Sequence, residues 1–226
     1  MSRIYLNNDW LFTPEFSEEL LAPQADVSAL QAVRLPHTCK ELPYHYFSEL
    51  EYQMLCGYRK SLEIPLEYRQ KRLFLQFDGA AHIATVYVNG KELAQHSCGY
   101  TAFRVEITDA VHTGENRVCV RLDTTENPAV PPFGFVIDYL TYGGLYREAW
   151  LDIRSESMIT DVYITTPTTE SVRLEVTAEK AEDCTVVAEI LNADGETLLK
   201  QTVGGTSEFA VPGGRKWSLN DRYRHT

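Results

Sequence analysis

Histidine, cysteine and glutamate side chains alternate in one short segment, a pattern that can bind a metal ion. His37, Cys39 and Glu41 follow one another at intervals of two residues, and His45 lies nearby. On an extended strand such residues share one face, and three or four of them can converge on zinc. Prolines bracket the segment, so we favour the other interpretation, a buried or hydrogen-bonded histidine at the end of a strand.

The segment from Pro128 to Arg147 has the composition of a loop that contacts a sugar. Two neighbouring prolines stiffen its start, two neighbouring glycines allow a tight backbone near its end, and it contains Asp138 and five aromatic residues. Aromatic faces stack on the C–H face of a sugar, and a carboxylate accepts hydrogen bonds from its hydroxyls. On the residues alone, a long inter-strand loop with packed aromatics and Asp138 capping a turn is the stronger alternative.

Self-sufficient catalytic motifs are missing from the sequence. It contains no Gly-x-Gly-x-x-Gly, no P-loop, no His-Glu-x-x-His and no Gly-x-Ser-x-Gly pattern. Glycoside hydrolysis with retention needs two carboxyl groups about 5–5.5 Å apart. None of the spacings among the 32 acidic residues singles out such a pair. We therefore name no catalytic residue in this chain.

The elements that position these residues are predicted to be β-strands. Apolar residues recur at every second position, which is typical of half-buried strands. Such runs include Leu73–Phe77, Thr85–Val88, Phe103–Ile107, Val118–Leu122 and Ala149–Ile153. Asn89-Gly90 predicts a type I′ hairpin turn. Ser17–Leu30 is expected to be a loop with at most one helical turn, because Pro23 interrupts it. The pattern indicates an all-β jelly roll or sandwich.

A change in composition near Arg154 to Ser157 predicts a domain boundary. We expect a jelly-roll domain over residues 1–155 and a smaller immunoglobulin-like sandwich over residues 156–226. A complete immunoglobulin-like sandwich takes about 100 residues and seven strands, whereas about five strands are expected here. The second domain is thus predicted to be truncated. Its open sheet edges would invite pairing with another copy, so we expect association into a homo-oligomer or local disorder near the C-terminus.

Charge and cysteine content exclude several classes of partner. The net charge of −11 would repel a phosphate backbone, so nucleic acid is not an expected partner. No apolar run reaches the roughly 18 residues of a membrane span, and the first residues lack the apolar core of a secretory signal. Five widely spaced cysteines fit reduced thiols. We therefore expect a cytoplasmic chain that does not contact a membrane.

Several blocks of residues together resemble the N-terminal part of glycoside hydrolase family 2, the group that contains β-galactosidases, β-glucuronidases and β-mannosidases. Their order and spacing from about residue 4 to residue 153 carry the resemblance, which is strongest to β-galactosidase-like members. The blocks are Leu6–Phe12, Leu35–Thr38, Gly57–Lys60, Leu75–Gly79, Val86–Gly90, Gly99–Phe103, Ile107–Asp109, Gly114–Asn116 and Gly143–Glu148.

The resemblance implies a sugar-binding jelly roll, then an immunoglobulin-like domain, then a catalytic (β/α)8 barrel. In the family both catalytic glutamates lie on the barrel, one of them after an asparagine, and this chain contains no Asn-Glu dipeptide. We therefore expect the chain to be the non-catalytic N-terminal portion of a retaining β-galactosidase-type glycosidase, inactive without its C-terminal barrel. A free-standing carbohydrate-binding module and an assembly scaffold are the alternatives.

One binding residue follows from the resemblance. Asp138 falls where the family places an aspartate that reaches the barrel mouth and contacts sugar hydroxyls, and Tyr142 on the same loop is expected to line that rim. Arg147 is expected to have a structural role within the sandwich. The resemblance implies no cofactor in this chain and allows a sodium or magnesium ion in the complete enzyme, whose substrate would be a β-galactoside or a related sugar.

Overall fold

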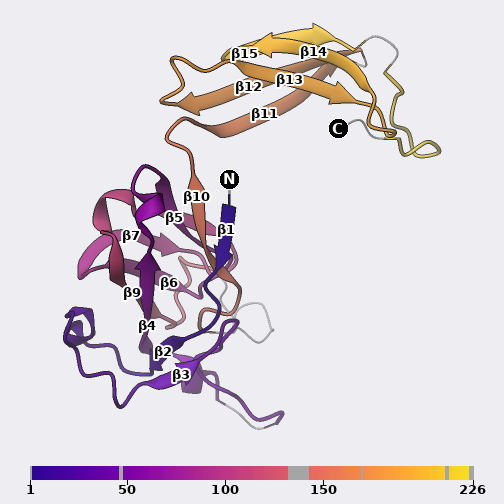
Figure 1. The fold of residues 1–226 in the computed structure, drawn as a ribbon. Helices are drawn as coiled ribbons and strands as arrows, with labels where there is room; N and C mark the ends of the chain where they lie inside the picture. Colours follow the sequence, from indigo (N-terminus) through magenta and orange to yellow (C-terminus); the bar gives the residue numbers. More distant parts are fainter. Residues whose placement is uncertain (1, 46–47, 132–142, 169, 212–213, 224–226) are drawn as a thin grey trace. The chain divides into compact units, whose positions relative to one another are not determined.

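The structure of the protein is a computed structural model. It describes residues 2–45, 48–131, 143–168, 170–211 and 214–223. The chain divides into two compact units, Met1–Ser155 and Glu156–Thr226. The division falls beside the change in composition near Arg154. Each unit is a set of antiparallel β-sheets (Figure 1).

The first unit contains a six-stranded and a four-stranded antiparallel sheet. The six-stranded sheet has the order β3 (Gln31–Val33), β2 (Trp10–Thr13), β4 (Leu55–Ile64), β9 (Gly114–Asp123), β6 (Ile83–Val88) and β7 (Lys91–Ser97). The four-stranded sheet has the order β1 (Ser2–Tyr5), β10 (Ala149–Arg154), β5 (Arg72–Phe77) and β8 (Phe103–Glu106). Short 3₁₀ helices lie between strands: η1 (Glu18–Leu21), η2 (Glu49–Tyr52), η3 (Leu66–Tyr68) and η4 (Thr108–Ala110).

The core of this unit lies between the two sheets and is built by the alternation seen in the sequence. Leu75 and Phe77 of β5 and Val86 and Val88 of β6 are fully buried members of one apolar cluster. Burial of such side chains contributes about 1.5–3 kcal/mol each. The predicted hairpin turn is confirmed, because Asn89 and Gly90 both have the positive φ, +51° and +82°, that a type I′ turn requires.

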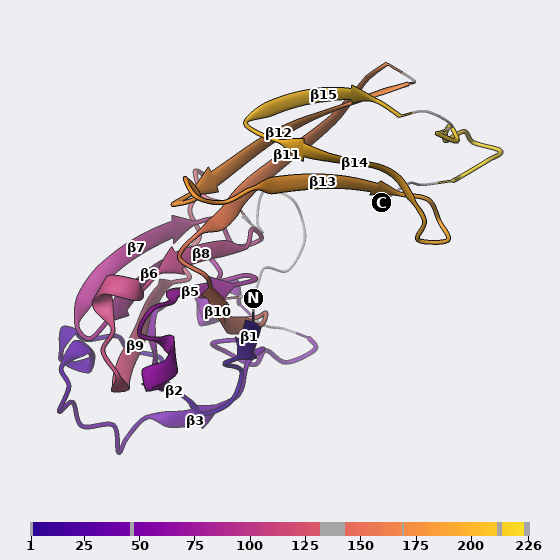
Figure 2. The same cartoon turned by 45° about the horizontal axis from the view of Figure 1, so that its top comes forward.

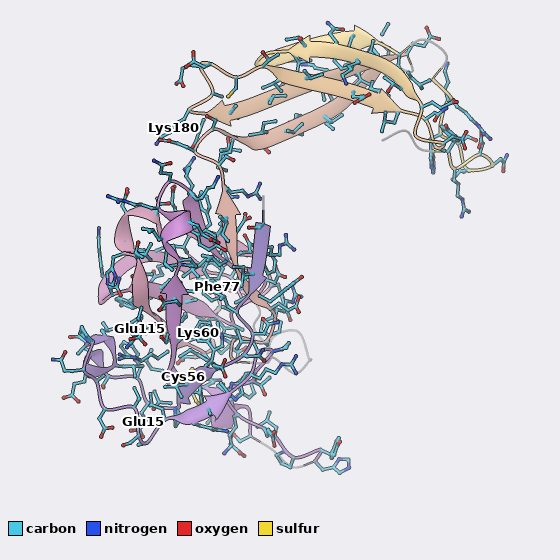
Figure 3. All side chains as sticks on the ribbon, viewed as in Figure 1. Glu15, Cys56, Lys60, Phe77, Glu115 and Lys180 are labelled. Carbon is cyan, nitrogen blue, oxygen red and sulfur yellow. The ribbon has the colours of Figure 1, made fainter. Side chains whose placement is uncertain are left out.

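Two adjacent cations of β4 hold surrounding backbone on opposite sides of the strand. Arg59 is buried, and its guanidinium donates hydrogen bonds to the carbonyl oxygens of Leu20, Ala22 and Pro23. Lys60 donates from Nζ to the carbonyl oxygen of Asn8 over 2.6 Å; Figure 3 shows its side chain in the first unit. The Arg59 contacts attach the connection between β2 and β3, which includes η1, to the central sheet, and the Lys60 contact holds the segment that precedes β2.

The second unit contains five strands among its described residues (Figure 2). One sheet has the order β11 (Met158–Thr168), β12 (Ser171–Glu179) and β15 (Thr206–Ala210), and β13 (Val186–Leu191) pairs with β14 (Thr197–Val203). Its core is small and centres on Leu174, Val203 and Phe209. Ile164 of β11 lies opposite Leu174 in the sheet, yet 62% of its surface is exposed. The apolar face of β11 is therefore only partly covered.

The predicted all-β fold class is confirmed. In the described residues the helical segments are all short 3₁₀ turns, and the single turn η1 lies inside the predicted Ser17–Leu30 loop. Within that part of the chain, no helix has the length and apolar character that crossing a membrane requires.

Candidate functional site

The two glycines that close the Pro128–Arg147 segment are held by backbone contacts. The Cys39 amide donates to the carbonyl oxygen of Gly143 over 2.9 Å, and Gly144 exchanges two hydrogen bonds with Ala81, of 3.0 and 3.1 Å. Gly144 has a φ of +131°. A Cβ at this position would overlap the carbonyl oxygen of His37. Only glycine allows the two backbone segments to approach so closely.

Tyr58 of β4 contacts both of these backbone segments, one through His37 and the other through Leu145. Its hydroxyl lies 2.9 Å from Nδ1 of His37 and accepts a 3.4 Å hydrogen bond from the Leu145 amide. The His37 amide donates to the Leu145 carbonyl oxygen over 2.9 Å. Burial raises the pKa of the Tyr58 phenol and lowers the pKa of His37. A protonated phenol and a neutral imidazole suit a hydrogen bond in which Tyr58 donates to His37.

Thr124 lies shortly before Pro128 and hydrogen-bonds both to the backbone that precedes β4 and to His82. Its hydroxyl donates to the carbonyl oxygen of Tyr52 and accepts from the Met54 amide over 2.8 Å. Its carbonyl oxygen lies 3.0 Å from Nδ1 of His82, a histidine that is only 1% exposed. Nε2 of His82 has no hydrogen-bond partner among the described residues. Burial lowers the pKa of His82, so the ring is neutral and Nδ1 donates.

The other end of the segment is also attached to the sandwich. The Gly99 amide donates to the carbonyl oxygen of Pro131 over 2.9 Å, and the Tyr146 hydroxyl donates to the Gly99 carbonyl oxygen. Arg147 donates to the carbonyl oxygens of Tyr100, over 3.1 Å, and Asp78, over 3.3 Å. Arg147 thus binds backbone within the sandwich, as expected for a structural residue. Both ends of the interval 131–143 are anchored on the first unit.

A stack of three rings supports the anchor at Gly99. His96 stacks on Phe103 with ring centroids 4.4 Å apart, and Phe103 stacks on Phe77 at 5.1 Å. Nε2 of His96 lies 2.9 Å from the Thr101 hydroxyl. The 96–101 turn is therefore held by both ring packing and a hydrogen bond.

The predicted sugar-contacting residues Asp138 and Tyr142 lie outside the described residues. The segment that begins with His37 is described, and there the hydrogen-bonded histidine is confirmed. His37 contacts Tyr58, and Sγ of Cys39 lies 3.5 Å from the Tyr52 carbonyl oxygen. In the described ranges no group of three His, Cys, Asp or Glu side chains is arranged to hold a metal ion. We derive no step through a metal.

Sequence reasoning missed most of the anchor. Thr124 and His82 carry no motif of their own, and Tyr58 belongs to the Gly57–Lys60 block without being singled out there. Each contacts residues that are distant in the chain. The pair Gly143-Gly144 was a usable signal, because two neighbouring glycines indicate a close backbone approach. The sequence did not indicate that His37 is the residue approached.

The chemistry of this arrangement is positioning. It consists of neutral rings, hydroxyl groups and backbone hydrogen bonds that fix the two ends of one segment.

Residues 39–131 match the family model for the glycosyl hydrolase 2 galactose-binding domain-like fold. The chain belongs to glycoside hydrolase family 2.

Relatives of this family 2 domain include enzymes with two different names. A β-galactosidase of Thermoanaerobacter pseudethanolicus is 33% identical over 197 residues, which are 84% of this chain and 26% of that protein. A β-glucuronidase of Bacteroides fragilis is 36% identical over 210 residues, 92% of this chain and 27% of that protein. The chain thus spans about a quarter of the length of the curated relatives it matches.

The fold agrees with solved structures of the family. A β-glucuronidase of an uncultured Clostridium species superimposes with a TM-score of 0.82 at 21% identity, covering 99% of this chain and 41% of that one. The match to the family model ends at residue 131, and the anchoring residues 143–147 follow it in the chain.

Proposed function

We propose that this chain is the non-catalytic N-terminal portion of a retaining β-glycosidase of the β-galactosidase type, and that its first unit shapes the rim of the sugar site. The observation that carries the proposal is the double anchoring of the interval 131–143. Gly99 holds its start, and Cys39, Ala81 and Tyr58 hold its end. Anchoring at both ends fixes where the interval leaves and rejoins the first unit, and therefore on which part of that unit the proposed rim lies.

In this proposal Asp138 accepts hydrogen bonds from sugar hydroxyls and Tyr142 lines the same rim. The nucleophile and the acid/base are glutamates of a barrel outside this chain, so the 226-residue chain alone hydrolyses no glycoside. A sodium or magnesium ion would belong to that complete enzyme. The relatives include both β-galactosidases and β-glucuronidases, and we propose the galactoside as substrate because the sequence blocks are most similar to β-galactosidase-like members.

The test compares variants in the enzyme that contains this segment. Asp138→Ala is expected to lower kcat/KM for a nitrophenyl β-galactoside more than tenfold, which corresponds to about 1.4 kcal/mol or more. Asp194→Ala, in an exposed turn of the second unit, is the matched control and should leave kcat/KM unchanged. An unchanged value for Asp138→Ala would contradict the assignment, and faster cleavage of the β-glucuronide would contradict the choice of sugar.

Calorimetry of the 226-residue chain separates this proposal from a free-standing carbohydrate-binding module. We expect no measurable binding of galactosides, because the rim needs the barrel to complete the site. Saturable binding that Asp138→Ala abolishes would favour the module instead.

A further inference from the structure

The outer surface of the four-stranded sheet carries a cluster of arginines. Side chains along a strand alternate between the two faces of its sheet, and Leu75 of β5 and Leu151 of β10 belong to the apolar core. The side chains next to them on each strand therefore point away from the core. Figure 1 shows β1 beside β10. The arginines on this outward side, which we call the arginine face, are Arg3 (β1), Arg154 (β10), Arg72 (β5) and Arg104 (β8).

Two buried aromatic rings on the arginine face hold three of its guanidinium groups. The guanidinium of Arg3 lies over the ring of Trp150, with Cζ 4.1 Å from the ring centroid. Those of Arg104 and Arg72 lie over Phe74, at 4.7 and 5.2 Å. The two rings are only 8% and 4% exposed. Stacking fixes a guanidinium group in place and leaves the N–H groups at its edge available for hydrogen bonds.

Acidic side chains neutralise two of the four arginines. Arg72 forms a bidentate ion pair with Glu106, with N–O distances of 2.9 and 2.7 Å. Nε of Arg154 donates to Oδ2 of Asp152 over 2.7 Å. Asp152 is 4% exposed, and its Oδ1 has no hydrogen-bond partner in the part of the chain that is described. Both acids are thus committed to arginines of the same face.

The other two arginines, Arg3 and Arg104, are exposed and are not neutralised in this way. Among the described residues no acidic side chain forms an ion pair with either of them, and Asp78 interacts with Arg3 through its charge alone. The rings beneath them, Trp150 and Phe74, lie at diagonal positions on the adjacent strands β10 and β5. Diagonal neighbours on one sheet face are about 7–8 Å apart. The sheet thus holds two unpaired positive charges close together, although the net charge of the chain is −11.

We propose that the arginine face is a docking surface for an acidic protein segment, in which Arg3 and Arg104 each bind one carboxylate of the partner. A guanidinium group binds a carboxylate through two parallel hydrogen bonds. Because the rings already fix both guanidinium groups, binding costs little side-chain entropy. The docking surface is independent of the proposed sugar site.

The chemistry of the arginine face favours a peptide over other anions. A sugar polymer stacks on exposed aromatic faces, whereas guanidinium groups cover Trp150 and Phe74. Two unpaired arginines on an acidic chain provide little of the positive charge that a nucleic acid requires. In an extended peptide, side chains at every second position lie on one side, about 6.6–6.8 Å apart. This spacing is close to that of the two rings, so the partner is expected to carry acidic residues at alternate positions.

The experiment measures the fluorescence anisotropy of a fluorescein-labelled peptide of Glu-Thr repeats, titrated with the 226-residue chain at low salt. We expect saturable binding that weakens as salt is added. Arg3→Gln combined with Arg104→Gln should weaken it at least tenfold. The matched control combines Arg34→Gln, directly after β3, with Arg121→Gln on β9. It removes the same charge from the six-stranded sheet and should leave the affinity unchanged.

Two further measurements distinguish lost docking from lost folding. The thermal unfolding midpoint of each variant is compared with that of the unaltered chain, and Arg104→Gln alone, at an exposed position, is used if the double variant does not fold. The proposal is overturned if the Glu-Thr peptide shows no saturable binding, or if the face variant and the control lose affinity equally. It is also overturned if polygalacturonate binds the face more tightly than the peptide, because the partner would then be a polysaccharide.

Discussion

The hydroxyl of Tyr58 lies 2.9 Å from Nδ1 of His37 and also accepts a hydrogen bond from the Leu145 amide, so it contacts two segments that are far apart in the chain. Tyr58 and Leu145 are both buried, so the Leu145 amide has no access to solvent if the Tyr58 hydroxyl is removed. This side chain therefore connects the central strand β4 to the end of the segment expected to carry Asp138.

Tyr58→Phe should destabilise the first unit by about 2 kcal/mol, because it leaves the Leu145 amide and the His37 imidazole without a partner. Urea unfolding followed by tryptophan fluorescence in a Trp217→Phe background measures this unit alone, since Trp10 and Trp150 both lie in it. Tyr163→Phe, at an exposed position of the second unit, is the control and should change nothing. Equal stability of the two variants would show that the hydroxyl has no anchoring role.

Gly144→Ala should cost more than about 3 kcal/mol or prevent folding of the first unit, because its Cβ would overlap the His37 carbonyl oxygen at a φ of +131°. Gly195→Ala provides the matched comparison. Gly195 also has a positive φ, of +82°, but no atom lies within 4 Å of its Cβ position, so only the backbone cost of about 1 kcal/mol remains. Similar losses in the two variants, measured by thermal unfolding, would argue against the close approach.

The first unit should lose stability as the pH falls below about 6.5. Burial lowers the pKa values of His37 and His82 from 6.5 in the folded chain. Between the unfolded and folded pKa values only the unfolded state binds these protons, so each histidine removes up to about 1.4 kcal/mol per pH unit. His82→Gln should flatten the dependence of the urea midpoint between pH 8 and pH 5. An unchanged slope in His82→Gln would contradict the assignment.

Arg59→Met should destabilise the first unit by about 3 kcal/mol, because three backbone carbonyl oxygens lose their buried donor. Hydrogen exchange should rise in the connection between β2 and β3. Arg69→Met removes the same charge at an exposed position and serves as the control. Increased exchange in both variants would mean that the charge, and not the contact, is responsible.

Association of the chain is expected to use the partly covered apolar face of β11 in the second unit. Val162 and Ile164 of β11 are 44% and 62% exposed, and β11 has a described sheet partner only in β12. Light scattering should give a mass above the 25.7 kDa of one chain, and Ile164→Lys should return it to that value. A monomer at high concentration in the unaltered chain would contradict this expectation.

Local features of the fold followed from the sequence to a large extent. The strands around Leu75, Val86 and Val120 could be predicted because alternation places every second side chain in the core. The Asn89-Gly90 turn could be predicted because few residue pairs accept its backbone angles. The order of strands within the sheets could not be predicted, since β10 lies between β1 and β5 although most of the first unit separates it from them in the chain.

In the candidate site too, some residues could be proposed from the sequence, whereas others were found only in the structure. Asp138 and Tyr142 came from composition and resemblance, and they stay predictions because they lie outside the described residues. The anchors at Gly144 and Tyr58 required the structure, because hydrogen bonds between residues far apart in the chain leave no periodic signal.

The sequence by itself determined the all-β class, the hairpin and the family resemblance, because these depend on residue types at short, regular spacings. Only the tertiary structure decided that His37 meets Tyr58 and Gly144. The physical reason is that these contacts form when separate strands pack into one core, and the packing selects partners that no local pattern specifies.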